Sequence, residues 1–405
     1  MVKRSSVAAF GWTYLSRDAV RKAEAQMASD TQGVRDEIGF LHIHQGYADR
    51  FFPGTSVLQL RLRYVLFVPW MYQGFLKRPP RGDVRTAVRD AEQQLVKRLS
   101  AESLGVIGRD SPNNIAVQPP SLVYWGALSA WGLLRTTDAG RYFTRAEVHA
   151  AVAAGKIIRD DDGTPLRDHV APFNTLPAPP LDWESCGAVC FALTPTEQVF
   201  LRGRWKKLSC PNDHLRPALL ARLAEHVIPE VLKVPACWSD ELVELADEEA
   251  PVLRRAQAAA SLAAVGRAVY AALVEEMRET KDSLPTPTVH RDQLNKVIDE
   301  HADLALTTDL DQVAADIGGL PVKLRPVLES TLAWLNRSTD TPSTLLPIFR
   351  HAEWERKGLR SRLSEQASSQ KRREEWDSNN YQVAQPLHYR WYRVRQMLAD
   401  LYGQP

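Results

Sequence analysis

The chain has 405 residues, 44% of them hydrophobic and 25% charged, with a formal net charge of +2. This composition excludes wholesale disorder and a globally cationic surface, so contact with nucleic acid would require local basic patches. Four cysteines in so long a chain are too few to indicate a disulfide framework. The sequence has no apolar run of the ~20 residues that a membrane span needs, and its start does not resemble a secretory signal. We therefore expect a cytoplasmic protein without membrane contact.

Helices are predicted over most of the N-terminal half, because apolar residues recur there at helical spacing. Between two of them, Leu58 and Leu62 indicate a further helix, with Thr55 or Ser56 as its cap and Pro69 expected to end or kink it. The other predicted helices cover residues 16–30, 34–51, 84–104, 121–135 and 144–155.

A small β component is predicted near residues 156–193. Residues 156–168 suggest a hairpin with Asp162-Gly163 at its turn. Because a helix precedes this hairpin, a winged-helix-like module is one interpretation of the segment. The run Asp160-Asp161-Asp162 also suggests a calcium loop, but the twelfth position is Ala171 rather than glutamate, which favours the turn.

The remainder of the chain is again predicted to be helical. Proline-rich segments at 172–182 and 284–288 indicate domain boundaries. We therefore expect a mainly α fold of two or three helical units, divided into 1–171, 183–283 and 289–405. The predicted helices cover residues 194–206, 213–233, 250–281, 290–303, 309–317, 321–336, 343–368 and 386–402.

One segment carries a distinctive motif, Phe52-Pro53-Gly54-Thr55-Ser56 followed by Arg61-x-Arg63-Tyr64-x-Leu66-Phe67-Val68-Pro69-Trp70. Phe10-Gly11-Trp12, Tyr124-Trp125 with Trp131-Gly132, and Leu193-Thr194 with Glu197 and Phe200-Leu201 occur before and after it. In these stretches the chain resembles a bacterial family of unknown function, DUF6361. The resemblance implies no activity and no catalytic residue. It implies only a neighbourhood of restriction or phage-defence genes, which slightly favours a role with nucleic acid.

The first candidate site is the basic stretch 59–98, in which nine Lys or Arg residues face three acids. Thr55 and Ser56 could add an anion-binding helix start, because free backbone N–H groups point outward there. Interleaved aromatic residues would suit single-stranded nucleic acid, whose bases stack on aromatic rings. The alternative is that the aromatic residues form the core and the charges a solvated face. The nucleic-acid-binding candidates in this stretch are Arg61, Arg63, Lys77 and Arg78.

The second candidate is residues 350–395, where eleven basic residues face six acids. Arg390, Arg393 and Arg395 lie among aromatic residues and could bind phosphate and stack on bases. The favoured alternative is a docking helix whose aromatic side chains face the core and whose arginines pair with carboxylates elsewhere.

Two sets of residues have side chains that could bind a metal ion, and for each a purely structural role is the favoured alternative. Cys186, Cys190, Cys210 and His214 form two pairs of zinc-ligand types, but the first pair lies in an apolar stretch, which favours buried free cysteines. His42, His44 and Asp49 could form a metal or catalytic site, but helical spacing would separate the histidines.

The sequence contains no P-loop, dinucleotide fingerprint, nucleophile elbow or His-Glu-x-x-His motif, and we predict no catalytic residue and no cofactor. We expect an accessory or adaptor protein. It would contact either nucleic acid or a protein partner that processes nucleic acid in a defence or restriction complex. One alternative is a metal-dependent nuclease whose carboxylates converge only in space. The other is a pure protein-binding scaffold.

Overall fold

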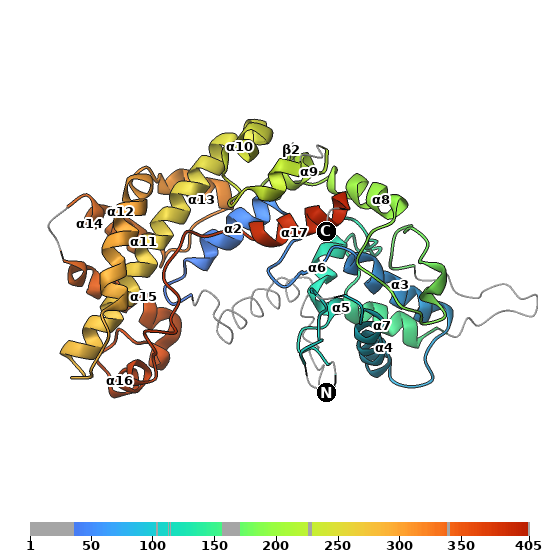
Figure 1. The fold of residues 1–405 in the computed structure, drawn as a ribbon, viewed down its shortest axis with the longest axis horizontal. Helices are drawn as coiled ribbons and strands as arrows, with labels where there is room; N and C mark the ends of the chain where they lie inside the picture. The colour runs from blue at the N-terminus through green and yellow to red at the C-terminus, as the bar shows by residue number, and fades with distance from the viewer. Residues whose placement is uncertain are drawn as a thin grey trace, which may run out of the picture.

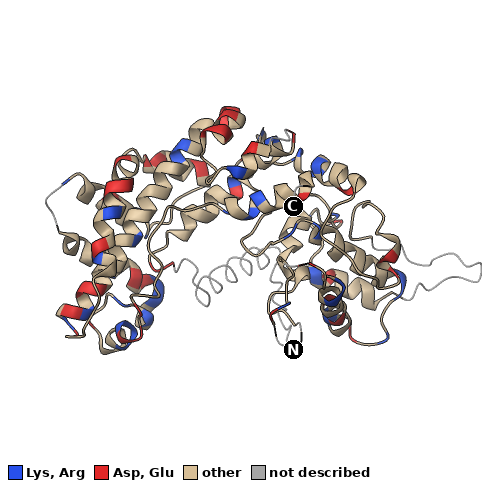
Figure 2. Cartoon of the chain, in the orientation of Figure 1, with Lys and Arg blue, Asp and Glu red and all other residues tan. Residues whose placement is uncertain are grey.

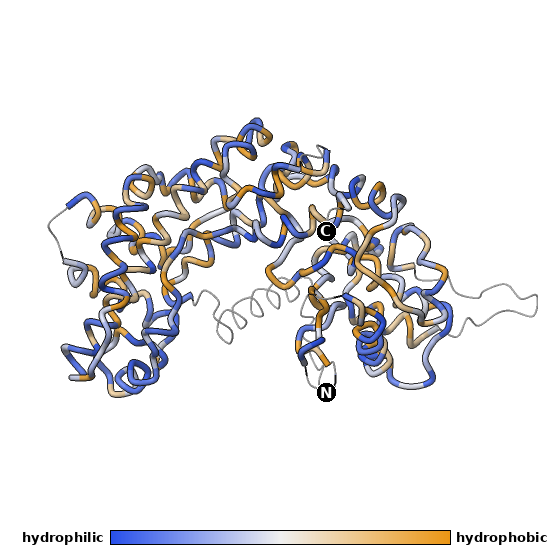
Figure 3. Tube along the Cα trace, in the orientation of Figure 1, coloured by the Kyte–Doolittle hydropathy of each residue, from blue (hydrophilic) through white to orange (hydrophobic). Residues whose placement is uncertain are grey.

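The computed structural model describes residues 36–102, 104–111, 113, 115–155, 171–225, 229–337 and 341–403. The fold is mainly helical, as predicted, and the described elements form an arch with two arms (Figure 1). One two-stranded antiparallel sheet is present among the described residues, formed by β1 (Ser209–Cys210) and β2 (Asp213–Pro217). Hydrophobic residues are spread along both arms and the centre (Figure 3), and the buried ones form a single core cluster.

One arm contains the helices from α3 to α8. Two of its helices begin with a capping box, in which Thr144 pairs with Glu147 and Thr194 with Glu197. The elements of this arm are α3 (Tyr64–Lys77), α4 (Val84–Arg98), α5 (Pro120–Val123), α6 (Trp125–Ala130), α7 (Arg145–Ala153), η2 (Leu181–Trp183) and α8 (Pro195–Trp205).

The other arm is built around α11 (Ala250–Thr280), a 31-residue helix that contacts α12, α13, α14 and α16. The stretch Asp240–Thr280 is the one described helical segment long and apolar enough to cross a membrane, but 89% of its apolar window is buried inside the protein. Such burial is typical of the core helix of a soluble protein. The remaining elements of this arm are α10 (Asp240–Ala246), η4 (Asp247–Glu249), α12 (Val289–Leu306), α13 (Leu310–Ile317), α14 (Arg325–Leu335), η5 (Pro342–Leu345), α15 (Leu346–Lys357), η6 (Gly358–Arg360) and α16 (Ala367–Glu374).

The centre of the arch is formed by α2 (Leu41–Phe51), α9 (Leu219–Glu225), η3 (Pro229–Lys233) and α17 (Trp391–Tyr402) (Figure 1). The C-terminal helix α17 therefore returns to the middle of the molecule, where it contacts η3 and α8. The division into three domains remains a prediction. One hydrophobic core cluster has members along the chain from Ile38 to Leu401.

The predicted helix start at Thr55 and Ser56 is wrong, because residues 55–63 form turns and α3 begins only at Tyr64. Tertiary partners bind the backbone N–H groups that a helix would use. The Tyr124 hydroxyl accepts hydrogen bonds from the N–H groups of Leu60 and Arg61, at 2.9 and 3.1 Å. Nor does α3 end at Pro69, since the burial of Trp70 and Tyr72 beyond it offsets the lost helical hydrogen bond.

The predicted β component near residues 156–193 is described only in part. The predicted hairpin at 156–168, with its Asp162-Gly163 turn, the calcium-loop alternative and the winged-helix interpretation that depends on the hairpin, lies outside the described residues. Among the described residues of this region, Phe173 forms an isolated β-bridge with Leu134. Residues 183–193 contain no strand, and the sheet instead occupies part of the predicted helix 213–233. The helix prediction is wrong over 213–217, because Pro217 interrupts it and the Asp213 side chain accepts a hydrogen bond from Leu215 N at 3.2 Å. Within the same range, α9 and η3 are helical.

We expect Gly54→Ala to lower the free energy of unfolding by about 2–3 kcal/mol. Gly54 has φ +81°, and a Cβ there would lie 2.7 Å from Ala130 Cβ and 2.7 Å from Trp131 Nε1. The indole cannot withdraw freely, because it donates a hydrogen bond to Pro53 O at 2.9 Å. Urea denaturation measures the loss. Gly74→Ala is the control, because nothing lies within 4 Å of its added Cβ and alanine stabilises a helix. Unchanged stability of Gly54→Ala would contradict the packing argument.

Candidate functional site

Of the motif arginines, Arg63 is buried and Arg61 is partly buried, and both are held by side chains from other elements. The Arg61 Nε donates to both carboxylate oxygens of Asp400 in α17, at 2.9 and 3.1 Å, and its guanidinium lies 4.5 Å from the centre of the Phe191 ring. Arg63 Nη2 donates to Glu197 Oε1 in α8 at 2.8 Å, and its Nη1 donates to Cys190 O at 2.8 Å. These two arginines join the start of α3 to α17 and α8, so they are not a surface for phosphate.

Thr55 and Ser56 are buried, with exposed fractions of 5% and 2%. The Thr55 hydroxyl donates to Phe52 O at 2.7 Å, and Ser56 N donates to Gln59 Oε1 at 3.2 Å. Their polar groups are therefore engaged within the turn rather than directed toward an anion.

The C-terminal arginines are also engaged internally. Arg390 is buried and donates to Asp49 Oδ1 and Thr55 O, both at 2.8 Å. Arg393 donates to Val57 O at 3.0 Å, and Arg395 donates to Val234 O at 3.2 Å. This arrangement resembles the docking-helix alternative in part, because Arg390 pairs with a carboxylate, whereas Arg393 and Arg395 bind backbone carbonyl groups.

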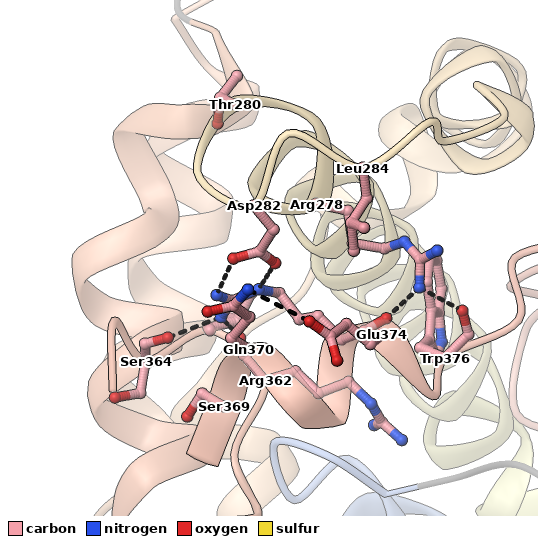
Figure 4. Close-up of polar contacts among 12 residues, drawn as sticks. Arg278, Thr280, Asp282, Leu284, Arg362, Ser364, Ser369, Gln370, Glu374 and Trp376 are labelled. Carbon is pink, nitrogen blue, oxygen red and sulfur yellow. Dashed lines mark hydrogen bonds and ion pairs between the residues drawn. The ribbon is translucent and has the colours of Figure 1, made fainter. Parts of the chain in front are cut away.

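A buried ionic network also holds the C-terminal segment near α16 (Figure 4). Arg373 donates from Nε and Nη2 to the carboxylate of Asp282, at 2.6 and 2.7 Å, and from Nη1 to Ser364 O at 2.7 Å. Arg278 donates to Trp376 O. A large part of the basic character of residues 350–395 is thus structural.

Lys77 and Arg78 differ from the other candidates because they are exposed. Together with the exposed basic residues that follow, they make up a set that we call the α3–α4 cationic face. Figure 2 colours the Lys and Arg positions along the chain, including those of α4. Its members are Lys77, Arg78, Arg81, Arg85, Arg89 and Lys97. The exposed acids of the same segment are Asp83 and Asp90. Asp83 caps α4 by accepting from Thr86 N at 2.8 Å, and its hydrogen bonds to Thr86 lower the pKa of its carboxyl.

Beside this face lies a cavity of about 560 Å³, which we call the α4–α7 pocket. Its buried interior includes Val88, Val96 and Trp125, while Arg89 and Tyr142 are among its exposed lining residues. The pocket exists because α4 packs against α7 and residues 115–121 lie across them. A largely apolar cavity of this size is the usual form of a small-molecule site.

Few polar groups enter the pocket. The buried Glu92 carboxylate accepts from Ser121 N at 2.7 Å, and burial raises the pKa of its carboxyl. Arg145 Nη1 lies 3.4 Å from Ser121 Oγ. The His149 ring lies 2.8 Å from the Tyr72 hydroxyl, and burial, followed by the charges of Arg145 and Arg85, lowers the pKa of this histidine.

No motif in the sequence predicts this pocket. Glu92 stands among basic residues, and the one local sign of its burial is its position on the apolar side of α4, four residues after Val88 and four before Val96. Arg145 and His149 carried no local signal, because only the packing of α7 against α4 brings them to the same cavity.

The residues of the two candidate metal sites are not brought together. Cys186 and Cys190 are exposed, Cys210 is buried in β1, and His214 lies on β2. Within the described ranges, no group of three or more His, Cys, Asp or Glu side chains could hold a metal ion. The cysteines are free, as the favoured interpretation has it, but the expected burial of Cys186 and Cys190 is wrong, because both are exposed.

His42, His44 and Asp49 also point to different partners, as expected for positions on a helix. His42 Nε2 lies 3.0 Å from Gly319 O, and His44 packs edge-on against His388 with ring centres 4.8 Å apart. Asp49 pairs with Arg390.

The sequence matches a protein family described as a family of unknown function (DUF6361) over residues 7–316. Neither the curated proteins nor the solved structures contain a match to the chain.

Proposed function

Because the chain belongs to DUF6361, a family of unknown function, we propose its function from its own surface: it is a non-enzymatic accessory protein that contacts nucleic acid through the α3–α4 cationic face. The observation that carries this proposal is the exposure of six basic residues between Lys77 and Lys97, against two exposed acids. Exposed cations neutralise phosphates without requiring a deep site. The arginines buried in ion pairs make no contribution to this surface.

The setting we propose is the bacterial cytoplasm, within a restriction or phage-defence complex. The family resemblance supports the bacterial and defence setting. A protein partner that processes nucleic acid would then bring the accessory protein to its substrate.

The α3–α4 cationic face can be tested by fluorescence anisotropy of labelled single- and double-stranded DNA and RNA, over a salt series. We expect binding that weakens steeply with salt. The triple variant Lys77→Gln/Arg78→Gln/Arg81→Gln should weaken binding about tenfold or more and reduce the salt slope by about 2–3, since each lost phosphate contact removes about one unit.

The matched control for that experiment is Lys206→Gln/Lys207→Gln/Lys371→Gln, which removes the same charge from exposed positions outside the face. It should leave the slope nearly unchanged. No binding by the wild-type protein at low salt, or equal losses in the two triple variants, would contradict the proposal.

The other two functions lack a comparable observation. A metal-dependent nuclease would need converging ligands, and none of the described side chains form such a group. A pure protein-binding scaffold would need a large exposed aromatic surface, whereas the described tryptophans lie mostly in the core.

A further inference from the structure

The α4–α7 pocket combines an apolar interior with an apolar entrance. Val88, Val96 and Trp125 are buried within it, and Trp125 is fixed by donating from Nε1 to Phe143 O at 3.1 Å. Ile115 and Val117 at its edge are exposed by 43% and 91%. Exposed apolar side chains cost free energy in water, and clusters of them beside a cavity mark ligand sites.

The charged residues around the pocket are mostly cationic. Arg85, Arg89 and Arg145 line it, and Glu92 is the one carboxylate among its lining residues. Neither Arg85 nor Arg145 forms a salt bridge with a described residue, although the charge of Arg145 acts on Glu92, and Arg89 lies 3.7 Å from Asp90 at the surface. Two cations from different helices thus line one cavity, which favours an anionic group there.

The single carboxylate does not cancel this preference. Glu92 is buried and bound to the backbone N–H of Ser121, which fixes its position at the start of α5. Burial raises the pKa of Glu92, while the hydrogen bonds from Ser121 and the charge of Arg145 act in the opposite direction. With one carboxylate against three arginines, the lining of the pocket still carries an excess of positive charge.

We propose that the α4–α7 pocket binds a small, largely apolar molecule that carries one anionic group. The apolar body occupies the cavity between α4 and α7, and the anionic group lies against the guanidinium of Arg145, with Arg85 nearby. The cavity volume of about 560 Å³ suits a drug-sized molecule. The pocket shares Arg85 and Arg89 with the α3–α4 cationic face, whereas its apolar interior and Arg145 lie outside that face.

A matched pair of fluorescent probes tests both halves of the proposal. 1-Anilinonaphthalene-8-sulfonate carries an apolar ring system and one sulfonate, and N-phenyl-1-naphthylamine is the same ring system without the charge. The wild-type protein should bind both, with a fluorescence increase, and should bind the sulfonate more tightly. Arg145→Gln should weaken binding of the sulfonate probe at least fivefold and change binding of the neutral probe by less than twofold.

A second variant tests the location of the site. Ala146 is exposed and lines the pocket on α7, so Ala146→Trp should fill the entrance and abolish binding of both probes. Ala150→Trp, one turn further along α7 and outside the lining, should bind as the wild type does. Thermal unfolding confirms that each variant is folded.

Three outcomes would overturn the proposal. They are the absence of binding by the wild-type protein, equal losses for the two probes in Arg145→Gln, and equal effects of the two tryptophan variants. Because Lys77, Arg78 and Arg81 do not line the pocket, their triple variant should bind both probes normally even if it no longer binds nucleic acid.

Discussion

Replacing Arg63 with methionine is expected to lower the free energy of unfolding by about 3–5 kcal/mol. The Arg63 and Glu197 side chains are only 4% and 2% exposed, and their ion pair at 2.8 Å joins the start of α3 to α8. Methionine fills part of the volume but leaves the Glu197 charge and the Cys190 carbonyl without their cationic partner. Urea denaturation followed by tryptophan fluorescence measures the loss.

Two comparisons separate this ion pair from a general loss of charge. Arg78→Met removes an exposed arginine just after α3 and should change stability by about 0.5 kcal/mol or less. The double variant Arg63→Met/Glu197→Gln should lose less than the sum of the two single variants, because neither partner is then left charged and alone. A loss below about 1 kcal/mol for Arg63→Met would show that water reaches the site.

The protein should lose stability between pH 6.5 and pH 4 through the buried pair His44 and His388. Burial, together with the charges of Arg267 and Arg390, lowers the pKa of His388 to about 4, and burial and the same charges with His388 lower the pKa of His44. In the unfolded chain both histidines titrate near pH 6.5. Below that pH the unfolded state therefore takes up protons that the folded state cannot, and folding becomes less favourable.

We expect His388 alone to account for about 3 kcal/mol of the free energy of unfolding. This stability is fully present above pH 6.5 and is lost as the pH falls to about 4. Urea denaturation at pH 7 and pH 4.5 measures the difference. His44→Phe/His388→Gln should reduce that difference, whereas His214→Gln should not, because His214 is exposed on β2. An identical difference in the wild type and the double variant would contradict the argument.

Local patterns in the sequence determined the mainly α class and several individual helices. The start of α8 is fixed by contacts within a few residues: Thr194 is the N-cap, Pro195 follows it, and Glu197 lies three residues after Thr194. The same is true of Thr144 and Glu147 at α7. The family motif was likewise visible in the sequence, since it consists of consecutive residues.

Only the tertiary structure decided which basic residues are available to a partner. Arg61 has its carboxylate partner 339 residues away, and Arg390 reaches Asp49 across 341 residues. Nothing in the neighbourhood of an arginine in sequence distinguishes such a buried pair from the exposed side chain of Arg78. The same limit hid the α4–α7 pocket, because a cavity is a property of helices packed together. Hydrogen bonding and hydrophobic periodicity act over a few residues and are encoded locally, whereas charge pairing and cavities depend on which distant segments the shared core brings into contact.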